Sequence, residues 1–144
     1  MIGFLIALIS GALMSIQGVF NTEVTKQSSV WVSASWVQFS ALLTCLAIWA
    51  VFDRSSLLTI GKVNPRYMLL GGLFGAFITY TVIQSMSALG PAKATMLIVI
   101  AQLTISWLVE LFGLFELEKG EFSWRKLIGL LAAIAGVILF EWES

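Results

Sequence analysis

The chain has 144 residues, of which 59% are hydrophobic and 11% charged, with equal numbers of acidic and basic side chains. A soluble domain is about half apolar and about a quarter charged, so this composition excludes an ordinary soluble domain and predicts an integral membrane protein. Zero net charge with scattered Lys and Arg excludes a basic face for nucleic acid, and one cysteine without histidine excludes an internal disulfide or a His/Cys metal site.

Five apolar runs follow one another along the chain, each close to the roughly 20 residues that a helix needs to cross a bilayer. The first run has no Lys or Arg ahead of it, so we interpret it as a retained helix and not as a cleaved signal peptide. The breaks between runs are short, so any activity is expected inside the membrane or at its faces. The sequence predicts an all-α membrane protein, a single transmembrane domain over 1–144, with helices at about 2–20, 30–52, 67–89, 94–115 and 124–142.

Positive charge is distributed unevenly between the two predicted faces. Lys26 and Lys93 lie on one side, and six basic residues lie on the side of the N-terminus: Arg54, Lys62, Arg66, Lys119, Arg125 and Lys126. The positive-inside rule then predicts a cytoplasmic N-terminus and a C-terminus outside.

Small residues recur four apart on three of the predicted helices, and such rows allow helix backbones to approach closely in lipid. The rows begin at Gly3, Gly71 and Gly129. Five helices form a thin bundle with more such seams than it can use, so we expect an oligomer. Ordinary seams within one bundle are the alternative.

Polar side chains occur inside or at the ends of four predicted helices. Buried amides need hydrogen-bond partners, so they either join neighbouring helices or line a wet cavity, and the pattern leaves both readings open. Trp36, Tyr80 and Trp107 also fall deep in their helices, where packing is the favoured explanation. The candidate substrate-binding residues are Gln17, Asn21, Gln38, Tyr80, Gln84, Gln102, Ser106 and Glu110.

Glu110 is the acid placed well inside a predicted helix, about five residues before its end, which is about 8 Å from the boundary. Gln102, Ser106 and Glu110 step along one ridge at a spacing of four. This ridge favours a lining role for Glu110, which could then exchange a proton for a cationic or neutral substrate. An interfacial carboxylate that reaches headgroups or water is the alternative.

An enzyme is not expected. The chain has no histidine, no GxSxG, no pair of intramembrane aspartates and no cluster of metal ligands. Intramembrane proteolysis or lipid chemistry would need one of these sets.

Several segments together resemble the YdcZ family, small bacterial inner-membrane proteins placed in the drug/metabolite transporter superfamily. The segments are GALMSIQGVFN, SALGPAKATMLIVIAQLTISW, LFGLFELEKGEFSW and RKLIGLLAAIAGVILF, which cover much of the chain. The resemblance implies one five-helix repeat, equivalent to half of a ten-helix transporter built from inverted repeats. The glutamate that some small multidrug transporters carry in their first helix has no counterpart here, because Gln17 stands there and Glu23 is predicted past the helix end.

These observations predict a secondary transporter protomer of the bacterial inner membrane that moves a small metabolite, amine or lipophilic compound by alternating access as a dimer, without a cofactor. Its partner is either a second copy, possible as an antiparallel homodimer, or an oppositely oriented homologous subunit, which the uneven loop charge favours. The rival hypothesis is a non-transporting membrane subunit or assembly factor that docks on a partner through its Gly/Ala seams.

Overall fold

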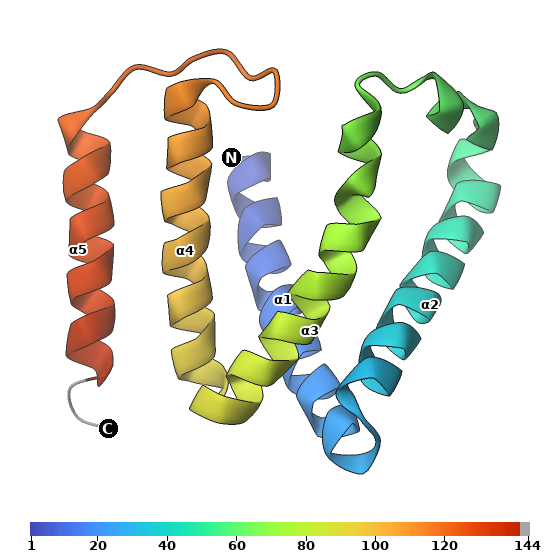
Figure 1. Cartoon of the computed structure of the whole chain (residues 1–144), viewed down its shortest axis with the longest axis horizontal. Helices are drawn as coiled ribbons and strands as arrows, with labels where there is room; N and C mark the ends of the chain where they lie inside the picture. The colour runs from blue at the N-terminus through green and yellow to red at the C-terminus, as the bar shows by residue number, and fades with distance from the viewer. Residues whose placement is uncertain (142–144) are drawn as a thin grey trace. The chain divides into compact units, whose positions relative to one another are not determined.

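The computed structural model describes residues 1–141, and within this range the chain is helical without any strand (Figure 1). It divides into two compact units, Met1–Ala88 and Leu89–Ser144. The first unit is built from α1 (Ile2–Gln27), α2 (Val30–Ile48) and α3 (Gly71–Leu89), and the second from α4 (Pro91–Phe112) and α5 (Trp124–Glu141). The predicted all-helical class is confirmed.

Four helical stretches are long and apolar enough to cross a membrane: Ile2–Gln27, Val30–Asp53, Arg66–Leu89 and Pro91–Phe112. The fifth predicted helix is present as α5, but it is not among these four because it carries Arg125 and Lys126 in its first turn and Glu141 at its end. The last predicted helical residue, Trp142, lies outside the described residues. Over residues 1–141 the regular structure is therefore all helical and includes four candidate spans.

Helix α1 continues to Gln27, so the predicted end at Phe20 was wrong, and Glu23 lies inside the helix, paired with Lys26. The polar residues that suggested a loop form side-chain hydrogen bonds to backbone carbonyls of the same helix. Thr22 Oγ1 donates to the Gly18 carbonyl and Thr25 Oγ1 to the Asn21 carbonyl, both at 2.8 Å. Hydroxyls bonded to carbonyls one turn earlier let a helix carry polar residues without ending. The polar residues therefore do not mark the end of the helix.

The segment between α2 and α3 contains short helical turns where the sequence suggested a plain break. A π-helical turn over Trp49–Asp53 follows α2, and 3₁₀ turns cover Leu57–Lys62 and Arg66–Leu70. Regular α-helix therefore begins at Gly71 and not at the predicted 67.

Helix α4 begins and ends earlier than predicted. It starts at Pro91 and not at Ala94, because proline at the first helical position has the required φ and lacks an N–H that the helix would leave unpaired. It ends at Phe112 because Gly113 adopts a left-handed φ of 62°. The Gly113 N–H then bonds to the Glu110 carbonyl, and the Leu114 N–H to that of Val109, which is the Schellman arrangement.

The first unit packs most tightly at one end of α1. Helices α1 and α2 meet at the short turn after Gln27 and diverge away from it (Figure 1). Near that turn Ser33 Oγ donates to the Asn21 carbonyl at 2.9 Å, joining α2 to α1. Gly18 faces α3, where a Cβ atom would lie 2.5 Å from Met86 Cε. A larger residue at position 18 would therefore require the Met86 side chain to move.

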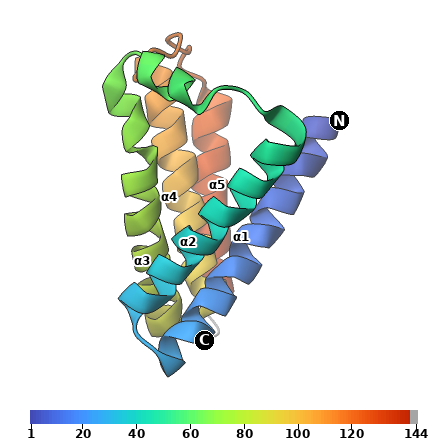
Figure 2. The same cartoon turned by 90° about the vertical axis from the view of Figure 1, so that its right-hand side faces the viewer.

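In the second unit, α4 and α5 run side by side in opposite directions, as both views show (Figures 1 and 2). The segment 113–123 connects them. This α4–α5 hairpin positions the pocket described below.

Replacing Gly18 with leucine is expected to lower stability by about 1–3 kcal/mol, because its side chain would overlap Met86 and overpack the contact. Thermal unfolding in detergent measures the effect. The double variant Gly18→Leu/Met86→Ala should recover at least half of the loss. A double variant as unstable as the sum of its two single variants would contradict this packing.

Candidate functional site

The candidate residues of the first unit occupy distinct surroundings. Asn21 is buried at the α1–α2 contact, where its carbonyl accepts from the Ser33 hydroxyl, while Gln17, one turn earlier, is exposed. Asn21 therefore contributes to helix packing in this unit, and the two side chains of the predicted α1 pair differ in accessibility.

Two of the candidate residues, Tyr80 and Gln84, lie one turn apart on α3. Tyr80 stacks on Trp31 with ring centroids 4.7 Å apart, and Gln84 Nε2 donates to the Tyr80 hydroxyl at 3.4 Å. Gln38 of α2 lies across from α3, with its Nε2 3.4 Å from the position a Cβ would take at Gly75. The structure thus brings Tyr80 and Gln84 together and places Gln38 against the same helix.

One expectation about the deep aromatic residues was wrong. Trp36 is 62% exposed in this chain, on the outer side of α2, and contacts Phe39 with ring centroids 6.0 Å apart. Tyr80 is half-buried in its stack with Trp31, as packing predicted.

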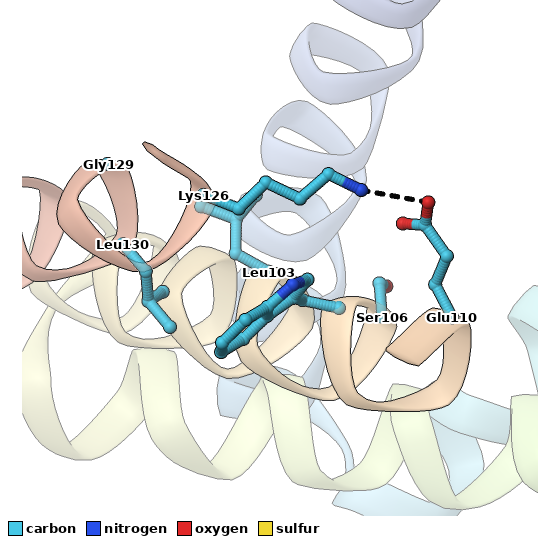
Figure 3. A pocket seen from close by; sticks show the side chains of 7 residues that line it. Leu103, Ser106, Glu110, Lys126, Gly129 and Leu130 are labelled. Carbon is cyan, nitrogen blue, oxygen red and sulfur yellow. Dashed lines mark hydrogen bonds and ion pairs between the residues drawn. The ribbon is translucent and has the colours of Figure 1, made fainter. Parts of the chain in front are cut away.

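A pocket of about 370 Å³ lies between α4 and α5 within the second unit. Its walls are mostly apolar and are formed by Leu103, Trp107, Gly129 and Leu130. Its polar groups come from Ser106, Glu110 and Lys126, as Figure 3 shows. A mostly apolar cavity of this size with a few polar groups is typical of small-molecule sites. Gln102, one turn before Ser106, is exposed and is not among the lining residues.

An ion pair lies at the polar end of the pocket. Lys126 Nζ of α5 donates to Glu110 Oε1 of α4 at 2.8 Å, and Figure 3 shows the lysine side chain reaching across to the carboxylate. Both side chains are about half exposed, at 47% and 53%. Because α4 ends at Phe112, Glu110 lies two residues from the helix end, so the predicted depth of five residues was wrong.

Glu110 is also the residue on which the α4–α5 connection closes. Its carbonyl accepts from the Gly113 N–H at 3.2 Å and from the Gly120 N–H at 2.8 Å. Gly120 approaches so closely that a Cβ there would lie 3.2 Å from Glu110 Cγ. The connection therefore holds Glu110 at both its backbone and its side chain.

Trp107 brings an unusual group to the pocket wall. Its Nε1–H is buried, and no acceptor bonds to it among residues 1–141. Its ring lies 5.9 Å from that of Phe122, between ring centroids. Leaving a buried donor unpaired costs about 1–3 kcal/mol.

Sequence reasoning missed Lys126 and the place of Trp107 on the pocket wall. Lys126 was counted only for membrane orientation, because nothing in a linear pattern pairs it with Glu110 sixteen residues earlier. A helical hairpin brings the last turn of one helix close to the first turn of the next. An acid in the former and a basic residue in the latter could therefore have indicated this ion pair from the sequence. Within residues 1–141 no three His, Cys, Asp or Glu side chains are grouped as a metal site would require.

The helices and their composition define an integral membrane protein. Residues 2–139 match the family described as "Putative inner membrane exporter, YdcZ", and the chain belongs to that family. The resemblance seen in the sequence is thereby confirmed, and the class is that of transporters and not of enzymes. No curated protein and no solved structure matches the chain.

Replacing Gly113 with alanine is expected to destabilise the α4–α5 hairpin by about 1–2 kcal/mol or more. The left-handed φ of 62° is costly for any residue with a Cβ, and that Cβ would lie 3.1 Å from the Leu117 carbonyl oxygen. The matched control is Gly136→Ala on α5, where a Cβ meets no atom within 4 Å. Thermal unfolding in detergent should separate the two variants, and equal stability would contradict the described turn.

Proposed function

We propose that this chain is one five-helix half of an inner-membrane exporter that moves a small metabolite, amine or lipophilic compound by alternating access as a dimer. The observation that carries the proposal is the family match over residues 2–139. Polar side chains on the candidate spans support it, because polar groups inside a membrane usually face a cavity or a partner.

In this proposal α5 is the fifth span. Its apolar stretch, 127–140, covers about 21 Å at 1.5 Å per residue, which is shorter than a bilayer core of about 30 Å. Arg125 and Lys126 at its start can extend their side chains to the interface while their stems remain in lipid. A shorter span is tolerated when its flanking residues reach outward in this way.

The dimer is supported by glycine rows that the chain leaves open. A Cβ added at Gly3, Gly11, Gly71, Gly129 or Gly136 would meet no atom within 4 Å. Rows of small residues allow another helix to approach closely. Because a single five-helix repeat inverts a fused second copy, the partner is either an antiparallel second copy or an oppositely oriented homologous subunit.

The proposed substrate cavity is wet and is lined by polar side chains of the candidate spans. Tyr80, Gln84 and Gln38 are supported by their grouping around α3, and Ser106 and Glu110 by their place in the α4–α5 pocket. The proposal also keeps Gln17, Asn21 and Gln102 as lining residues in the assembled transporter. The rival, a non-transporting docking subunit, is supported by the open glycine rows and by the buried position of Asn21 at the α1–α2 contact.

A cysteine at Gln102 is expected to react with a membrane-impermeant methanethiosulfonate reagent, in a background with Cys45 replaced by serine, because the cavity is proposed to be hydrated. The matched control is a cysteine at Leu97, which is also exposed and lies about 140° away around α4. Labelling at 102 should be at least tenfold faster than at 97. Equal, slow labelling at both positions would favour the docking subunit.

The C-terminus is expected outside the cytoplasm and the N-terminus inside, since five spans place the two ends on opposite faces. Fusions at the C-terminus test this directly. Alkaline phosphatase fused there should be active and a fluorescent protein should stay dark. The reverse result would leave α5 as a helix that does not cross the membrane.

A further inference from the structure

The α4–α5 pocket presents both signs of charge beside an apolar wall. Glu110 and Lys126 form its polar end, and Leu103, Trp107 and Leu130 line the rest. We propose that this pocket binds a small zwitterion with an apolar side chain, an α-amino acid by its chemistry, whose ammonium pairs with Glu110 and whose carboxylate pairs with Lys126. The inference rests on the proposed export function and names its substrate class.

The first argument is charge balance. A ligand with only a positive charge would pair with Glu110 and leave Lys126 without a counter-charge. A ligand with only a negative charge would pair with Lys126 and leave the Glu110 carboxylate without a counter-charge. Each of these half-exposed charges gains from a counter-charge beside it, although the gain is small. A zwitterion that enters between the two side chains gives each a new counter-charge and keeps the pocket neutral.

The second argument is that the ion pair can open. Both side chains are about half exposed, and ion pairs of that kind contribute little to stability. Glu110 is the fixed member, since its carbonyl holds Gly113 and Gly120 and its Cγ packs against Gly120. Lys126 carries its ammonium on a flexible four-carbon stem, so it can move aside as the ligand enters and then close on the carboxylate.

The third argument is the excess of donors on the polar lining. The Ser106 hydroxyl lies on the lining together with the Lys126 ammonium. The polar lining thus supplies two kinds of donor (hydroxyl and ammonium) against the single carboxylate of Glu110. A carboxylate ligand offers several lone pairs to these donors, and its ammonium uses the one acidic group.

The fourth argument is size and lining. A pocket of about 370 Å³ lies near the lower end of the range for small-molecule sites, about 300–1,000 Å³. The leucine and tryptophan side chains suit an aliphatic group. Leucine is therefore the probe of choice.

The experiment measures binding of radiolabelled L-leucine to the purified full chain in nanodiscs. L-leucine methyl ester, which keeps only the positive charge, and N-acetyl-L-leucine, which keeps only the negative charge, are the competitors. Both are expected to bind at least tenfold more weakly than leucine. A methyl ester that competes as well as leucine would make this a cation site, an N-acetyl compound that does so would make it an anion site, and either result overturns the proposal, as does absence of leucine binding.

Two single variants separate ligand binding from a structural role of the ion pair. Glu110→Gln should weaken leucine binding at least tenfold and reduce the discrimination against N-acetyl-L-leucine. Lys126→Gln should weaken leucine similarly but reduce the discrimination against the methyl ester. The unfolding temperature of each variant serves as the control for folding. If the variants unfold at the same temperature as the wild type and bind leucine, its methyl ester and N-acetyl-L-leucine with unchanged affinities, the proposal is overturned.

If a single variant fails to fold, the double variant Glu110→Gln/Lys126→Gln takes its place, because it replaces the ion pair by two neutral amides that can bond to each other. This double variant should lose selectivity among the three compounds. Retained selectivity in this double variant contradicts the proposal. Labelling at position 102 separates this inference from the export function. Labelling without leucine binding rejects the zwitterion site alone, and leucine binding without labelling supports the site and rejects the hydrated cavity.

Discussion

The pairing of backbone groups inside helices is the constraint on which the rest of this structure depends. In hydrocarbon an unpaired N–H or C=O costs several kcal/mol, so a spanning segment must be helical along its whole length. Polar residues are then accommodated within helices and do not interrupt them. In α1 the Thr22 and Thr25 hydroxyls bond to carbonyls one turn earlier, and the helix continues through the polar segment to Gln27. Helix ends are set instead by special backbone conformations, as at Gly113.

At the end of α4 this constraint and the pocket meet in one residue. Glu110 uses its carbonyl to hold the following connection and its carboxylate to pair with Lys126 of α5. The turn at Gly113 therefore fixes both the fold of the hairpin and the position of the pocket's negative charge.

The chain buries few side chains by itself. Among residues 1–141, the buried hydrophobic side chains are Ala34, Ile83, Met86 and Ala94. In a membrane the remaining apolar surface faces lipid or another subunit, and lipid supplies no hydrophobic force that would distinguish the two. Close packing at small residues then becomes the main means of association. This is the physical basis for proposing a dimer from the open glycine rows of a YdcZ-family exporter half.

Composition and hydropathy by themselves determined the membrane class and the helical fold, because the bilayer permits few other structures for such a chain. The sequence also located five helical segments and the family. Their limits depended on local geometry, including the hydroxyl bonds of α1 and the left-handed turn at Gly113, which polarity does not encode. Ser106 and Glu110 were recognisable as candidates from their spacing on one ridge. Only the tertiary structure decided that Lys126 and Trp107 join them, because a hairpin brings together residues that are distant along the chain.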